Sequence, residues 1–134
     1  MAGALVDSNV LLDLLTEDPG WFEWSSQALA HAAERLPVVI NPIIYAEVSI
    51  RFERIEELDE ALPPMMFRRD PLPWEAGFLA GKCFRTYRRQ GGARRSPLPD
   101  FYIGAHAAVA GLTLLTRDAA RYRTYFPRLA MIAP

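Results

Sequence analysis

The stretch ALVDSNVLL, residues 4–12, decides the fold because it joins a buried strand directly to a helix. Residues 4–6 are a short apolar run, which is typical of a strand that is covered on both faces. Asp7, Ser8 and Asn9 then supply side chains that cap helix N-termini, and apolar residues follow at helical spacing. The stretch therefore predicts a first strand that ends at Asp7 and passes straight into a helix.

The same alternation of strand and helix continues along the chain. Apolar runs predict strands at residues 38–40 and 112–116, with shorter candidates at 65–69 and 128–132. Helices are predicted over residues 21–36, 42–52, 55–62, 73–90, 99–110 and 119–125. This alternation predicts a single α/β domain over residues 1–134, with a central, mainly parallel sheet of four to five strands.

Composition excludes several broad classes of protein. The chain has 134 residues, 51% of them apolar and 23% charged, which fits one compact domain and not a disordered chain. The net charge of -1 excludes nucleic-acid binding by overall charge, so any such contact must come from local patches. Fourteen of the fifteen basic residues are arginine. Arginine suits bidentate contacts with phosphate, although biased codon usage explains the excess equally well.

Signals of cell location point to the cytoplasm. Cys83 is the single cysteine, so no internal disulfide can form, which fits a reducing compartment. The first residues lack a basic segment, and two aspartates interrupt their apolar run, so we expect no signal peptide. The longest weakly polar stretch, residues 107–115, is too short to cross a membrane.

Four acidic residues are predicted to share one edge of the sheet. Asp7 and Asp118 follow strands, Glu47 lies in the second turn of a predicted helix, and Asp100 lies in the first turn of another. In a parallel α/β sheet, the carboxyl ends of strands and the starts of the following helices meet at the same edge. Clustered carboxylates without Cys or His favour Mg²⁺ or Mn²⁺. Helix capping by each aspartate, or solvent exposure of Glu47, is the alternative.

Four segments resemble the motifs of PIN-domain ribonucleases, in particular toxins of the VapC type. They read LVDSNVLL at residues 5–12, NPIIYAE at 41–47, PDFYIGAHA at 99–107 and LLTRD at 114–118, the last followed by Tyr122. Each motif is short, but together they span nearly the whole chain in the family's order. The resemblance implies the three-layer α/β/α PIN-like fold.

The same resemblance implies an activity and its residues. Asp7, Glu47, Asp100 and Asp118 would form a catalytic metal site for Mg²⁺ or Mn²⁺, and this site would hydrolyse RNA phosphodiester bonds. The residues that support the site in this family correspond to Ser8, Asn9 and Thr116. Either Asp100 or Asp118 would orient the attacking water as general base. Many relatives carry a further acid where this chain has Arg121, which leaves one or two ions open.

The resemblance also implies partners. PIN toxins of this type bind a small VapB-like antitoxin protein, often through the first helices, and form homodimers. Three aromatic residues, Trp21, Phe22 and Trp24, fall within four positions and cannot all face one core, so part of this group is expected at a partner surface.

An arginine-rich segment surrounds Gly91 and Gly92 and leads directly to Asp100. Its members are Arg85, Arg88, Arg89, Arg94 and Arg95. Such a basic rim beside an acidic site would guide an RNA backbone toward it, and we expect Arg89, Arg94 and Arg95 to contact RNA. A solvated helix face is the alternative.

Other classes fit the sequence less well. A phosphate-accepting receiver domain needs a lysine at a strand end, but Lys82 falls in the middle of a predicted helix. A dinucleotide-binding fold needs a glycine-rich turn after the first strand, where this chain has Asp7 and Ser8. A PIN nuclease that processes RNA without being a toxin, and a catalytically silent PIN-fold binding module, remain as alternatives.

Overall fold

A computed structural model describes residues 2–134, so residue 1 of the predicted domain lies outside the described part. Its centre is one five-stranded sheet with the strand order β3-β2-β1-β4-β5. Every pair of neighbouring strands is parallel. The strands are β1 (Ala4–Val6), β2 (Val38–Ile40), β3 (Arg68–Arg69), β4 (Thr113–Leu115) and β5 (Met131–Ile132). The predicted α/β class with a parallel sheet is confirmed.

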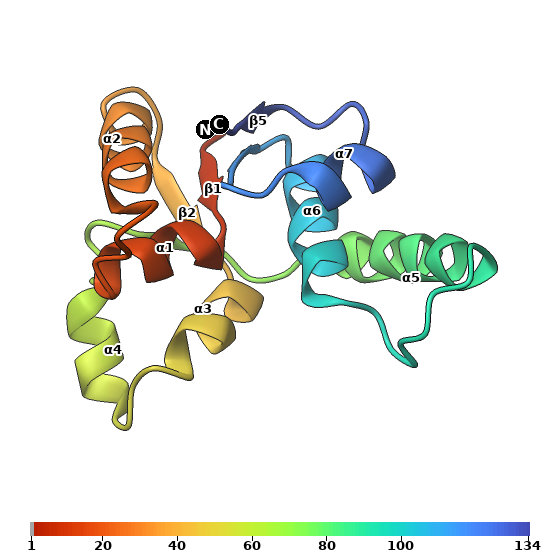
Figure 1. Cartoon of the computed structure of the whole chain (residues 1–134), viewed down its shortest axis with the longest axis horizontal. Helices are drawn as coiled ribbons and strands as arrows, with labels where there is room; N and C mark the ends of the chain where they lie inside the picture. The colour runs from red at the N-terminus through yellow and green to blue at the C-terminus, as the bar shows by residue number, and fades with distance from the viewer. Residues whose placement is uncertain (1) are drawn as a thin grey trace.

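In the part of the chain that the structure describes, seven helices cover the two faces of the sheet. They are α1 (Ser8–Leu15), α2 (Phe22–Ala33), α3 (Pro42–Ser49), α4 (Ile55–Ala61), α5 (Trp74–Arg89), α6 (Pro99–Ala110) and α7 (Ala120–Tyr125). Figure 1 shows α1 to α4 on one side of β1 and α5 to α7 on the other. This separation follows from right-handed crossovers, because the chain adds strands in one direction as far as β3 and then returns past β1 to add β4 and β5.

The central strands are apolar on both faces, because helices cover both. Every residue of β1 and β2 is buried. Such two-sided burial explains why these strands are continuous apolar runs and not alternating patterns. The sheet is therefore a rigid platform whose carboxyl edge carries the residues that follow β1, β2 and β4.

Two edge strands are shorter than the sequence predicts. The expected strand at residues 65–69 is reduced to Arg68–Arg69, because Met66 and Phe67 donate their backbone N–H groups to the Pro63 carbonyl and form a turn. The expected strand at 128–132 is reduced to Met131–Ile132, since the Leu129 N–H bonds back to the Phe126 carbonyl. The predicted helices are correct in number and order within the described residues, and their ends coincide with the prediction or differ from it by at most three residues.

No helix in the described residues is long and apolar enough to cross a membrane.

Candidate functional site

Asp7 lies at the junction of β1 and α1, and its carboxylate is only 3% exposed. Oδ1 caps α1 by accepting the Ser8 backbone N–H at 2.8 Å. Oδ2 accepts hydroxyl hydrogen bonds from Thr116 and Tyr122, each at 2.9 Å. The capping role and the site role, which the sequence left as alternatives, are thus combined in one side chain.

Glu47 is brought to Asp7 by α3. Asn41 begins this helix by accepting the Ile44 N–H at 2.9 Å, and Pro42 occupies the first turn. Glu47 then lies half-buried in the second turn, where its Oε1 accepts the Ser8 hydroxyl at 2.9 Å. Ser8 therefore links the two acids, because the same hydroxyl also lies 3.5 Å from Asp7 Oδ1.

Asp100 reaches the same place from the first turn of α6. Its Oδ1 lies 3.3 Å from the Tyr122 hydroxyl, which also contacts Asp7. Its Oδ2 lies 3.5 Å from Nη1 of Arg121. Among residues 2–134, Arg121 is the one cation that forms an ion pair with any of the four predicted site acids.

Asp118 is the most solvent-exposed member of the set. It follows β4, and its backbone N–H donates to the Thr116 hydroxyl at 3.2 Å. Its carboxylate is near enough to Asp100 to raise the pKa of that group by charge repulsion. The structure therefore brings all four acids to one edge of the sheet, with Asp7, Glu47 and Asp100 linked through Ser8 and Tyr122 and Asp118 at the rim.

Burial and like charge both act on these carboxylates. Burial is the largest cause that raises the pKa of Asp7, Glu47 and Asp100. Repulsion among the acids raises the pKa of each further, against hydrogen bonds that lower it. The pKa of Tyr122 is also raised, first by burial and then by the charges of Asp7 and Asp100. Its hydroxyl therefore keeps its proton and serves as a donor between the two acids.

The donor set suits a hard divalent cation, although it does not form a closed cage. Its ligand atoms are carboxylate oxygens, and the buried His106 is paired with Asn41 instead. Among residues 2–134, no three His, Cys, Asp or Glu side chains stand close enough to hold a metal ion together. Mg²⁺ nevertheless binds commonly through one or two carboxylates and several waters. The arrangement fits that mode, with Asp7 and Asp100 as the pair that shares the Tyr122 hydroxyl.

The predicted supporting residues form one hydrogen-bond network with Asp7. The Asn9 amide donates to the Thr116 hydroxyl at 3.2 Å and lies 3.5 Å from Asp7 Oδ2. Asn9 also accepts the backbone N–H of Arg117 at 3.3 Å. The network ties the start of α1 to the loop after β4 and so fixes both segments that carry site acids.

Two residues at the site were missed as site residues by the sequence analysis. The Tyr122 hydroxyl joins Asp7 to Asp100, and Arg121 pairs with Asp100. Tyr122 is 1% exposed, so its ring belongs to the core while its hydroxyl belongs to the site. The available signal was position, because Tyr122 follows the fourth motif by four residues.

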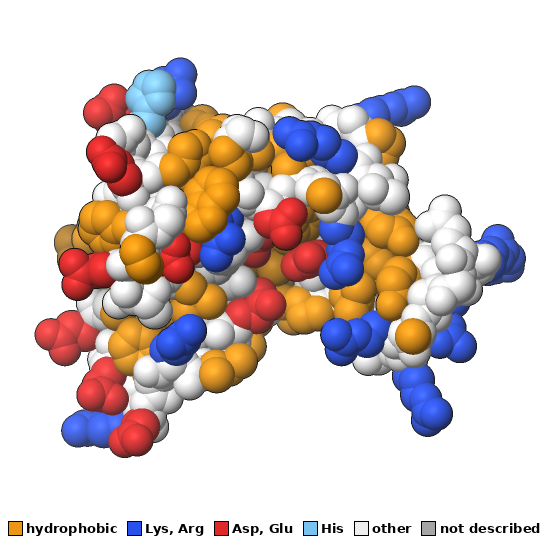
Figure 2. All heavy atoms as spheres, in the orientation of Figure 1, with side chains coloured by type: hydrophobic (Ala, Val, Ile, Leu, Met, Phe, Trp, Pro, Cys, Tyr) orange, Lys and Arg blue, Asp and Glu red, His pale blue; other side chains and the backbone are white. Residues whose placement is uncertain are grey.

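The basic rim lies at the end of α5 and in the loop that leads from it to α6. Arg89, Arg94 and Arg95 are exposed, and none of them forms an ion pair within the described residues. Arg88 holds the loop after α5 by donating to the carbonyls of Gly92 and Arg94. Figure 2 shows basic side chains gathered over α5 and this loop, whereas acidic side chains occupy the centre and the opposite end.

The aromatic group at the start of α2 is mostly packed. Trp21 and Trp24 meet edge to face at 6.1 Å, and the Arg117 guanidinium lies 5.3 Å from the Trp21 ring centre. Phe22 is the member that is exposed.

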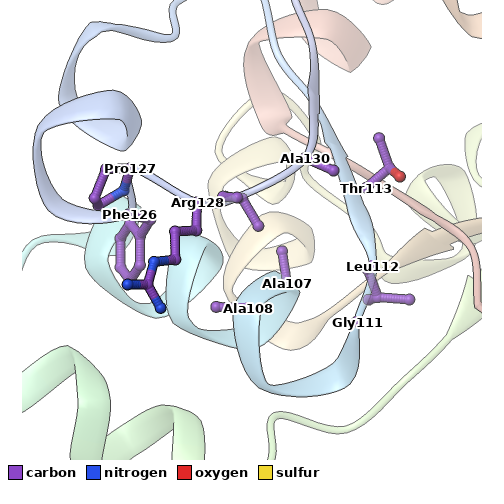
Figure 3. Close-up of a pocket in the computed structure, with 10 residues that line it drawn as sticks. Ala107, Ala108, Gly111, Leu112, Thr113, Phe126, Pro127, Arg128 and Ala130 are labelled. Carbon is purple, nitrogen blue, oxygen red and sulfur yellow. The ribbon is translucent and has the colours of Figure 1, made fainter.

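A hollow of about 640 Å³ lies at the opposite edge of the sheet, between α6, the start of β4 and the segment before β5. Figure 3 shows that small side chains such as Ala107 and Ala108 line it together with Phe126 and Arg128. Its described lining contains no carboxylate, so the candidate functional site is the acidic cluster at the carboxyl edge of the sheet.

Comparison with known proteins agrees with this geometry. A family model described as the PIN domain matches residues 4–127. A search of curated proteins finds no match. Among solved structures, VapBC2 from Rickettsia felis, bound to a promoter DNA fragment, matches with a TM-score of 0.73 and 16% identity, covering 98% of each chain. VapBC-1 from nontypeable Haemophilus influenzae matches with a TM-score of 0.72 and 19% identity, covering 97% of this chain and 96% of that one.

FitAcB from Neisseria gonorrhoeae gives a TM-score of 0.70 and 23% identity, covering 96% of both chains. At these identities the likeness concerns the fold. The family match and these neighbours confirm the resemblance that the four sequence motifs predicted.

Proposed function

The chain belongs to the PIN domain family, and on that premise we propose that it is a metal-dependent endoribonuclease that hydrolyses RNA phosphodiester bonds. The observation that carries the proposal is the meeting of Asp7, Glu47 and Asp100 around the hydroxyls of Ser8 and Tyr122. Buried carboxylates that repel one another destabilise a fold, so their presence at one place favours a chemical role.

The four acids have different roles in the proposed site. Asp7 and Asp100 would bind a Mg²⁺ or Mn²⁺ ion directly, with Glu47 and Asp118 holding its waters. When bound, such an ion polarises the phosphate and lowers the pKa of an attacking water. Asp118 is exposed and Asp100 is half-buried, so either can accept the proton of that water.

We propose a single tightly held ion. Arg121 lies beside Asp100, where its guanidinium already neutralises part of the acidic charge. The same guanidinium is placed to contact a non-bridging phosphate oxygen, because it is partly exposed and rigid hydrogen-bond forks match phosphate well.

The biological role proposed is that of a toxin neutralised by a small VapB-like antitoxin in the cytoplasm, with the toxin itself forming a homodimer. The neighbours in fold include VapBC and FitAB complexes, whose assembly supports a protein partner for this chain. Exposed apolar side chains near α3 and α4 offer a surface for it: Ile50, Ile55, Met65 and Met66. An adjacent reading frame for a small DNA-binding protein would support this role over one in RNA processing.

Metal dependence is the direct test of the nuclease proposal. Cleavage of a labelled single-stranded RNA should stop in EDTA and return when Mg²⁺ or Mn²⁺ is added in excess. The chain should remain folded in EDTA by circular dichroism, because its core does not depend on the acidic site. Cleavage that resists the chelator would exclude the metal mechanism, and a pure chain that never cleaves would favour the silent binding module.

The basic rim predicts a specific change in salt dependence. Replacing both Arg94 and Arg95 with Ala should weaken RNA binding and reduce the slope of log K against log salt by about 0.7 for each lost phosphate contact. Filter binding in EDTA at several salt concentrations measures this slope. Arg35→Ala is the control, since Arg35 is exposed just after the end of α2. An unchanged slope in the double variant would mean that Arg94 and Arg95 make no contact with RNA phosphates.

A further inference from the structure

One face of α5 carries two large aromatic side chains that the fold does not use. Trp74 is 94% exposed and Phe78 is 70% exposed. They lie four residues apart and therefore one above the other on the same face of the helix. The core contacts of α5 come from another face, where Ala76, Ala80 and Cys83 are buried.

The aromatic face is open and already holds a cation. The Lys82 ammonium lies 4.9 Å from the centre of the Phe78 ring. Gly77 and Gly81 lie in the same turns, and a Cβ atom at either position would meet nothing within 4 Å. Because Trp74 and Phe78 are themselves largely exposed, a flat group can approach the two rings from solvent.

Positive charge continues along the same face. Positions 74, 78, 82, 85 and 89 follow the helical repeat, and the last two are the exposed arginines Arg85 and Arg89. We call these five residues the α5 stripe. Residues 76–134 carry ten of the fifteen basic side chains but two of the sixteen acidic ones. Glu75 is the one acid beside the stripe within α5.

This charge decides between two kinds of partner. Two copies of the chain that met along their α5 stripes would bring like charges together, with Lys82 near the middle of the contact. A polyanion with exposed flat rings would instead satisfy both features at once. Single-stranded nucleic acid has this chemistry, because its bases stack on aromatic side chains while arginine and lysine bind the backbone. In a duplex the base faces are covered by their neighbours.

We propose that the α5 stripe binds single-stranded RNA, with bases stacked on Trp74 and Phe78 and phosphates held by Lys82, Arg85 and Arg89. The inference rests on the proposed nuclease function and deepens it, since it assigns a surface outside the acidic site that would hold the RNA. The loop of residues 90–98 runs from the end of α5 to the first turn of α6, which carries Asp100. The stripe and the basic rim therefore form one continuous stretch of chain that ends at the acidic site.

Two substitutions of Trp74 separate stacking from hydrophobic docking. Trp74→Leu keeps an apolar side chain but removes the ring, whereas Trp74→Tyr keeps a ring that can stack. A 12-nucleotide single-stranded RNA is titrated in EDTA, which prevents cleavage, and binding is followed by fluorescence anisotropy. We expect Trp74→Leu to weaken binding by about 5- to 150-fold, as the loss of one stacked base does, and Trp74→Tyr to restore most of it. Neither variant should change affinity for the same sequence as a duplex.

Tryptophan fluorescence gives an independent readout. Trp21 and Trp24 are half-buried, so RNA should quench mainly Trp74, and the quenching should be lost in Trp74→Leu. Equal binding by wild type and Trp74→Leu would overturn the proposal. Equal losses for the single strand and the duplex would also overturn it. Acrylamide quenching of Trp74 can also be measured without RNA. If this quenching decreases as the protein concentration increases, the α5 stripe binds a second copy of the chain instead.

Failure of this inference can be distinguished from failure of the nuclease function. Binding is measured in EDTA and needs no cleavage, whereas the function depends on cleavage by the wild-type chain with metal. If the wild type cleaves RNA and Trp74→Leu binds RNA as tightly as the wild type does, the α5 stripe proposal is wrong and the nuclease proposal stands.

Discussion

Asp7→Asn should reduce RNA cleavage by at least about 10²-fold while making the folded chain more stable at neutral pH. The loss of activity follows from the central position of Asp7, whose carboxylate contacts the hydroxyls of Thr116 and Tyr122. An amide is a poor ligand for Mg²⁺ compared with a carboxylate. The fold should tolerate the change, because the remaining amide oxygen can still accept the Ser8 N–H that begins α1.

The gain in stability follows from the sign of the pKa shift. Burial, with repulsion from Asp100, raises the pKa of Asp7 above its ordinary value of 3.8, despite hydrogen bonds that lower it. The folded state therefore holds the proton more tightly than the unfolded state, so the free energy of unfolding falls as pH rises through the window above 3.8. Asparagine carries no charge and avoids this loss. The greater stability of Asp7→Asn should therefore be present at neutral pH and disappear below pH 3.8, the ordinary pKa of aspartate.

Urea unfolding in EDTA at several pH values measures this effect, because a bound cation would otherwise stabilise the wild type. Asp59→Asn is a control with the opposite sign. Hydrogen bonds from Tyr45 and Arg69 lower the pKa of Asp59, so loss of its charge should destabilise the chain at neutral pH. Wild-type stability that exceeds that of Asp7→Asn at neutral pH in EDTA would contradict the account of a strained acidic site.

Local sequence predicted the parts of the fold whose cause is local. The central strands β1, β2 and β4 are apolar runs, and the starts of α1 and α3 carry capping residues, so both kinds of element could be recognised without the structure. The edge strands β3 and β5 could not be bounded in this way. Arg68 and Arg69 become a strand because they pair with β2, which is a property of the sheet and not of the two arginines.

The same limit applies to the site. The edge that collects Asp7, Glu47, Asp100 and Asp118 follows from strand direction, which the sequence pattern supplies. The role of Tyr122 does not follow from strand direction. Its hydroxyl contacts Asp7, which lies more than one hundred positions away in the sequence. Arg121 is 21 positions from Asp100 in the sequence, so its place beside that acid also needed the folded chain.

Asp13 shows how a nearby acid takes a different role. It lies in α1, six residues after Asp7, and is 2% exposed. Its Oδ2 accepts the Ser25 hydroxyl at 2.7 Å and the Arg117 Nε–H at 2.8 Å. Because a cation neutralises it and buried hydrogen bonds satisfy it, Asp13 is a structural acid. Asp7 has no such cation among the described residues.

Asp13→Ala should lower the free energy of unfolding by about 2–4 kcal/mol, since it leaves the fully buried Ser25 hydroxyl and the Arg117 guanidinium without their acceptor. Asp13→Asn keeps an oxygen acceptor and should lose less. A double-mutant cycle with Arg117→Met isolates the ion pair, for which we expect a coupling of about 1–3 kcal/mol. Arg117 lies between Thr116 and Asp118, so this coupling measures how firmly α1 holds the loop of the fourth acid. A coupling near zero would mean that the backbone bond from Arg117 to Asn9 holds the loop instead.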